Sequence, residues 1–156
     1  MIAQESAIAT KQDTLLIAAR EIMTMNQYCA LITCDSSGQP QARTMNPFQP
    51  DENMVVWIAT NRDSRKVKEI QNNPHVCVYY ADHKEAVGYV PLIGQARIVD
   101  DKDALQKMKR NYWEGIPDWQ NIMVMIEIVP EKIEVINYKY NLVNASDTWA
   151  APTMEF

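Results

Sequence analysis

The sequence has 156 residues, of which 47% are hydrophobic and 22% charged, a composition typical of a single globular domain over residues 1–156. A chain of this length can bury a core large enough to fold without disulfides or a structural metal. The formal net charge of −5 argues against nucleic acid as the main partner, because binding a phosphate backbone requires a broadly basic surface.

The cysteines and the first residues of the chain indicate the cellular compartment in which we expect the protein. Cys29, Cys34 and Cys77 are odd in number and form no CxxC pair, so they predict no disulfide framework and favour a reducing compartment. The chain opens without a basic segment followed by an apolar stretch, and no apolar run approaches the roughly 20 residues of a membrane helix. We therefore expect a cytoplasmic protein with no signal peptide and no membrane partner.

Periodicity in the first half of the chain predicts two helices and three strands. The signals are an apolar stripe at helical spacing, a Ser-Ser-Gly-Gln-Pro turn between two runs of strand formers, and a continuous apolar run. The continuous run is typical of a strand buried on both faces, and Asp13 could cap the first helix. The expected elements are a helix at 14–25, strands at 28–35, 41–48 and 54–60, and a helix at 64–72, after an irregular segment at 1–12.

The second half of the chain predicts four strands and one helix. Gly88, Pro91 and Gly94 interrupt a long strand-like run and indicate the bends that a small barrel needs. Since most strands follow one another through short turns, the order favours a mainly β, α+β fold built as an antiparallel barrel. The expected elements are strands at 76–81 and 86–99, a helix at 103–113, strands at 122–129 and 133–137 joined by Pro130-Glu131, and an irregular tail at 138–156.

Positive side chains gather at the start of the helix expected at 64–72. A helix N-terminus carries about half a positive charge, so Arg65 and Lys66 stand where cations are unfavourable. A bound anion resolves the conflict, because backbone N–H groups, the Ser64 hydroxyl and the two cations together suit a phosphate. The alternative is that these are solvated surface residues, with Asp63 and Glu69 partly offsetting their charge.

Arg43 is the second feature of interest, because it lies inside a predicted strand. Strand alternation places it on the same face as Gln41 and Met45, opposite Ala42 and Thr44. If that face points into the barrel, Arg43 needs a partner, since an unpaired buried charge is costly. A solvent-facing arginine is the alternative.

These features occur in an order that resembles the pyridoxamine 5′-phosphate oxidase-like, FMN-binding split-barrel superfamily, and its short general stress protein type most of all. The resemblance covers about residues 14–137. The motifs that carry it are a hairpin ending in Arg-Thr-Met, WIATN, SRKVKEI with Asn-Pro before the next strand, GQARIVDD, Tyr-Trp-Glu-Gly, Asp-Trp and Val-Pro-Glu-Lys-Ile-Glu.

The resemblance implies an antiparallel split β-barrel that forms a homodimer, with FMN in the clefts at the subunit interface. By motif position, Arg43 and Lys66 would contact the FMN phosphate, with Ser64 and Arg65 beside them. Thr44 and Met45 would border the flavin through their backbone, and Gln95 would reach it from the same or the second subunit. The remaining implied contacts are with Ile58, Ala59, Thr60 and Asn61 along the ring and ribityl chain, and with Trp149 over the ring.

The function expected from this resemblance is an FMN-dependent oxidoreductase acting on an unidentified small molecule. No catalytic acid or base stands out, which leaves a non-catalytic flavin-binding or redox-sensing module as the alternative. Vitamin B6 oxidation is less favoured, because the tail lacks the arginine-rich segment of true pyridoxamine phosphate oxidases. A deazaflavin would use a related site, whereas a haem would need His75 or His83 as its axial ligand, and neither histidine has metal-ligand spacing.

Overall fold

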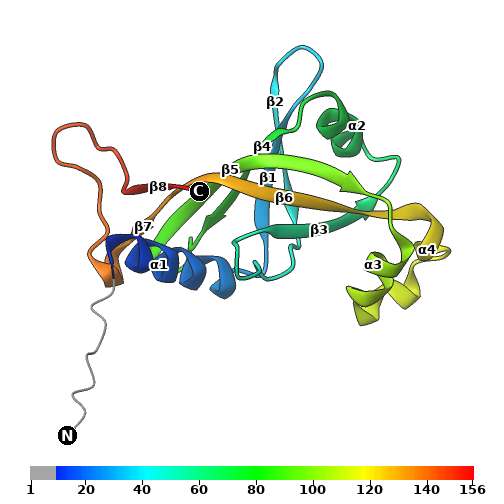
Figure 1. Ribbon diagram of the computed structural model, residues 1–156, viewed down its shortest axis with the longest axis horizontal. Helices are drawn as coiled ribbons and strands as arrows, with labels where there is room; N and C mark the ends of the chain where they lie inside the picture. Colours follow the sequence, from blue (N-terminus) through cyan, green and yellow to red (C-terminus); the bar gives the residue numbers. More distant parts are fainter. Residues whose placement is uncertain (1–9) are drawn as a thin grey trace, which may run out of the picture.

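The computed structural model describes residues 10–156 as one curled antiparallel sheet with helices at its ends and along one side (Figure 1). Its strands are β1 (Cys29–Cys34), β2 (Pro40–Met45), β3 (Val56–Asn61), β4 (His75–Ala81), β5 (Gly88–Val99), β6 (Met123–Glu134), β7 (Ile136–Asn137) and β8 (Thr153–Glu155). Its helices are α1 (Lys11–Met25), α2 (Arg65–Asn72), α3 (Lys102–Lys107) and α4 (Trp119–Ile122), with 3-10 turns η1 (Asn111–Gly115) and η2 (Tyr138–Tyr140).

The strand order explains why the barrel is split. Hydrogen bonds link the strands in the order β2-β1-β4-β5-β6-β3, while β7 pairs with β5 and β8 with β6. All of these strand pairs are antiparallel, as the short connections predicted. The path therefore ends at β2 on one side and β3 on the other, so the sheet curls into a half-barrel with an opening between these two strands.

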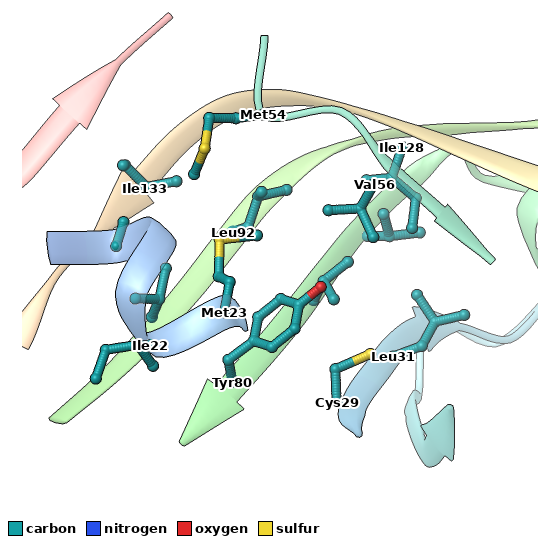
Figure 2. Packing of buried hydrophobic residues seen from close by; sticks show 14 of the residues in the cluster. Ile22, Met23, Cys29, Leu31, Met54, Val56, Tyr80, Leu92, Ile128 and Ile133 are labelled. Atoms are coloured by element: carbon teal, nitrogen blue, oxygen red, sulfur yellow. The ribbon is translucent and has the colours of Figure 1, made fainter. Parts of the chain in front are cut away.

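The main core lies between the concave face of the sheet and α1. Figure 2 shows Met23 of α1 next to Tyr80 and Leu92 of the central strands, and Ile22 of α1 belongs to the same cluster. The helix begins at Lys11, three residues earlier than predicted, and its N-cap is Thr10 and not Asp13, which completes the capping box three residues later. No helix within residues 10–156 is both long and apolar enough to cross a membrane.

A second hydrophobic cluster explains the continuous apolar run of β3. Val56 and Ile58 belong to the main core, while Trp57 and Ala59 on the other face pack against the second cluster. The residues of this second cluster are Leu105, Trp113, Trp119, Met123 and Met125. Burial on both faces was predicted for this strand, and it is confirmed.

The helix predicted at 103–113 is wrong in extent, because the chain leaves the helical path after α3 and continues into η1. The Arg110 guanidinium donates to the carbonyl oxygens of Asn46 and Pro47 at 3.1 and 2.7 Å and lies 4.1 Å from the Phe48 ring centroid. These contacts tie the chain to the loop after β2, so that Trp113 turns inward.

The last strands also differ from the prediction. The runs expected at 122–129 and 133–137 form mainly one strand, β6, which passes through Pro130 at a register irregularity opposite Ile93 and Gly94. A proline lacks the N–H that a regular ladder needs, so a bulge accommodates it. The tail expected to be irregular contributes β8, which pairs with β6. Residues 1–9 of the expected irregular start lie outside the described residues.

We expect Gly94→Ala to destabilise the protein by about 2 kcal/mol, because its added Cβ would lie only 2.1 Å from the Val129 carbonyl oxygen. Chemical denaturation measures the change in the free energy of unfolding. Gly115→Ala is the matched control, since its Cβ would meet nothing within 4 Å. Equal stability of the two variants would contradict the close approach of β5 and β6.

Candidate cofactor-binding site

The basic cluster predicted from the sequence lies at the opening of the half-barrel. Helix α2 follows β3 through a short turn, in which the Ser64 amide donates to the Asn61 carbonyl oxygen at 3.1 Å. Side chains of α2 contact both ends of the sheet path: Lys66 contacts Thr60 of β3, and Glu69 contacts Arg43 of β2. Helix α2 thus links the two strands that the sheet does not join.

Arg43 points to the inner side of the sheet, which decides between the two orientations that the sequence left open. Its position on β2 pairs with Leu31, and one guanidinium nitrogen donates to the Leu31 carbonyl oxygen at 3.3 Å and to the Thr33 hydroxyl at 2.6 Å. The second nitrogen donates to Glu69 Oε2 at 2.8 Å. The side chain is only 16% exposed, so these acceptors supply the partner that a buried charge requires.

Glu69 is a buried carboxylate, 5% exposed, at the centre of the cluster. The Thr33 hydroxyl donates to its Oε2 at 2.5 Å, and Arg65 Nε lies 3.0 Å from its Oε1 without hydrogen-bond geometry. Burial acts to raise the pKa of Glu69, but the hydrogen bonds from Thr33 and Arg43 and the charges of Arg43 and Arg65 hold it below its ordinary value. Glu69 is therefore the shared counter-ion of the two arginines.

Lys66 is half-buried and has no carboxylate in direct contact among the described residues. Its ammonium donates to the Thr60 hydroxyl at 3.1 Å. Burial and then the charge of Arg43 lower the pKa of Lys66, with Glu69 opposing them. The three cations Arg43, Arg65 and Lys66 against the single carboxylate of Glu69 leave the cluster with a net charge of +2.

Ser64 is the N-cap residue of α2, but its hydroxyl does not cap the helix. Its Oγ is buried and has no hydrogen-bond partner within residues 10–156. The first amides of a helix have no intrahelical acceptor either, and they carry the positive end of its dipole. A buried unpaired hydroxyl beside surplus positive charge fits an oxygen-rich anion.

The structure brings together five of the residues singled out in the sequence, namely Arg43, Thr60, Ser64, Arg65 and Lys66. Ile58 faces the main core on the same side of β3 as Thr60, whereas Ala59 faces the second cluster. Asn61 is exposed, and its side-chain oxygen accepts from the Asp63 amide at 2.8 Å. On β2, Met45 packs against the main core, while Thr44 is exposed on the outer face.

Gln95 and Trp149 lie apart from this cluster within the chain. Gln95 is exposed on the outer face of β5 and donates to Glu131 Oε1 at 2.5 Å. Trp149 is 79% exposed in the segment between η2 and β8, and Figure 1 shows that this segment and α2 lie at opposite ends of the molecule.

Sequence reasoning missed Thr33 and gave Glu69 only a minor part. The spacing of Arg65 and Glu69, four residues apart on one helix, was a visible signal for their ion pair. The contact of Thr33 with both Arg43 and Glu69 had no local signal, because it depends on the pairing of β1 with β2 and on the position of α2 over them.

A comparison with known protein families identifies the family of the chain. The family model described as pyridoxamine 5′-phosphate oxidase matches residues 15–141, most of the chain. The chain belongs to this family. General stress protein 26 of Bacillus subtilis (strain 168) is 31% identical over 105 residues, which cover 64% of this chain and 73% of that protein.

Solved structures of family members share the fold. A protein related to general stress protein 26 from Clostridium acetobutylicum superposes with a TM-score of 0.73 at 17% identity, covering 91% of this chain and 94% of the other. A pyridoxamine 5′-phosphate oxidase-related, FMN-binding protein from Nostoc punctiforme PCC 73102 gives a TM-score of 0.62 at 14% identity, covering 96% and 98%. The family member described here therefore has the FMN-binding split-barrel fold predicted for it.

Replacing Glu69 by glutamine should lower the free energy of unfolding at neutral pH by about 3 kcal/mol, because it leaves Arg43 without its buried counter-ion. Since the pKa of folded Glu69 lies below its ordinary value of 4.5, its stabilisation is present above that pH and is lost as the pH falls through the folded pKa. The difference between wild type and Glu69→Gln should therefore shrink below about pH 4.5.

Denaturation curves measured at several pH values test this dependence. Glu134→Gln is the control, because Glu134 is 36% exposed and lies 3.8 Å from Lys132, so its loss should cost less than about 1 kcal/mol. A difference between wild type and Glu69→Gln that stays constant down to pH 3 would contradict the ionised state assigned to Glu69.

Proposed function

We propose that this protein binds FMN and acts as a flavin-dependent oxidoreductase on an unidentified small molecule. The observation that carries the proposal is the buried Ser64 hydroxyl, which has no hydrogen-bond partner among residues 10–156 and lies beside a cluster with a net charge of +2. FMN ends in a phosphate monoester, which carries close to two negative charges at neutral pH. Charge and hydrogen-bonding capacity of the cluster both match this group.

Each residue of the cluster has a distinct part in holding the phosphate. Ser64 would donate its hydroxyl and Lys66 its ammonium, since within the described part of the chain the hydroxyl has no hydrogen-bond partner and the ammonium no carboxylate partner. Arg65 would move from Glu69 to the phosphate, since its side chain is 67% exposed. Arg43, held by three acceptors, would contribute a fixed positive charge.

The strand that leads into α2 would orient the rest of the cofactor. We propose that Ile58, Ala59, Thr60 and Asn61 follow the ring and ribityl chain, and that Thr44 and Met45 border the flavin through their backbone. Because both faces of β3 are packed against apolar clusters, this strand provides a rigid support. FMN, when bound, supplies the hydride and electron transfer chemistry, and the protein positions it.

A second copy of the chain is the proposed partner, with the cofactor sites at the interface. The outer face of the sheet supports this, because Ile32, Cys77 and Ile93 lie in register across β1, β4 and β5 and are only half-buried. Gln95, two residues after Ile93 on β5, lines a groove of about 440 Å³. Val129 lines the same groove, and its side chain is 46% exposed. Cover by a second chain would bury this apolar surface and bring Gln95 toward the partner's cofactor.

Lys66→Met should weaken FMN binding by roughly 10- to 100-fold, since a hydrogen bond to a charged group contributes roughly 1.5–3 kcal/mol. Purified wild-type protein should show flavin absorbance, and titration of apoprotein with FMN, followed by fluorescence quenching, gives the affinity. Lys68→Met is the matched control, because it removes the same charge from the exposed side of α2. Equal affinities for the two variants would place the phosphate elsewhere.

Ile32→Asp should convert the dimer to a monomer, because it places a charge in the centre of the proposed interface. Light scattering coupled to size-exclusion chromatography measures the mass in solution, and circular dichroism checks the fold. Ile17→Asp is the control, since Ile17 is 52% exposed on α1, away from the outer sheet face. A monomeric wild type, or a variant that remains dimeric, would refute the interface.

A further inference from the structure

A carboxylate inside a site for a negatively charged group requires an explanation. Glu69 is 5% exposed and touches two of the three cations that are proposed to attract the phosphate. A phosphate bound at the start of α2 would be repelled by this neighbour, since charges of the same sign interact strongly at a poorly solvated position. Glu69 would therefore oppose the binding of a phosphate, although its ion pairs with Arg43 and Arg65 stabilise the cluster.

Arg43 and Arg65 depend on Glu69 to different degrees. Arg43 has two further acceptors, the Leu31 carbonyl oxygen and the Thr33 hydroxyl, so its position does not rest on Glu69 alone. Arg65 is 67% exposed, and within residues 10–156 its only ion pair is the one with Glu69, which lacks hydrogen-bond geometry. Arg65 is the cation that can leave Glu69 at the least cost.

We propose that Glu69 is an affinity-setting residue, an internal anion that competes with the cofactor phosphate for Arg65 and lowers the affinity of the site for that phosphate. This inference rests on the proposed phosphate site at α2 and goes beyond it. Without the carboxylate, the net charge of the cluster rises from +2 to +3. Glu69 thus stabilises the cofactor-free chain and weakens its hold on the cofactor.

The test compares FMN with riboflavin, which has the same ring and ribityl chain but lacks the phosphate. Glu69→Gln should bind FMN about tenfold more tightly than wild type, because one unit of repulsion close to the phosphate is gone. Its affinity for riboflavin should stay within about twofold of wild type, since neutral riboflavin does not sense that charge. Glu155→Gln is the matched control, because it removes one negative charge from the exposed strand β8, and both affinities should stay unchanged.

Opposite results would overturn the inference. If Glu69→Gln binds FMN no more tightly than wild type, Glu69 serves only to support Arg43. If the affinities for FMN and riboflavin rise together, the effect does not act on the phosphate. Should Glu69→Gln fail to fold, Glu69→Asp keeps the charge but shortens its reach to Arg65, so FMN should bind more tightly than to wild type, and unchanged binding would refute the competition.

Inorganic phosphate separates this inference from the proposed cofactor. If neither wild type nor variant binds FMN, the proposed function fails, and the melting temperature in the presence of phosphate then decides the role of Glu69. If phosphate raises the melting temperature of Glu69→Gln more than that of wild type, the result supports the inference. An equal rise, or none in either protein, overturns it.

Discussion

A positive charge on the inner side of a curled sheet has to be paired, and Arg43 meets this requirement through Glu69 at 2.8 Å. The contact joins β2, one end of the sheet path, to α2, which continues from β3 at the other end. The same carboxylate accepts from Thr33 and holds Arg65. The ion pair therefore fixes the position of α2 across the opening of the half-barrel, and with it the cations and the hydroxyl of the candidate site.

The two hydrophobic clusters give this arrangement its support. Val56 and Ile58 anchor one face of β3 in the main core, and Trp57 and Ala59 anchor the other. A strand fixed on both faces delivers Ser64 and the first turn of α2 to a defined place. The site thus combines a strand held rigidly on both faces with a charge cluster in which Glu69 offsets part of the positive charge.

Local patterns predicted much of the fold. The hairpin of β1 and β2 followed from strand-forming residues on either side of a turn signal, and the burial of both faces of β3 followed from its continuous apolar run. The prediction of one helix over 103–113 was wrong, because the contacts that redirect the chain there are not local. Arg110 donates to the carbonyl oxygens of Asn46 and Pro47, which lie 64 and 63 positions away in the sequence. The continuity of β6 through Pro130 also escaped prediction, since it depends on the bulge opposite Gly94.

The sequence by itself determined the features that rest on near neighbours: the residues of β2 that share a face with Arg43, and the cations at the start of α2. Only the tertiary structure decided that Glu69, 26 positions from Arg43, is its partner and that Thr33 joins them. It also separated Gln95 and Trp149 from the cluster. Local backbone geometry sets the direction of a side chain, but the partner it meets depends on strand pairing and packing across the whole chain.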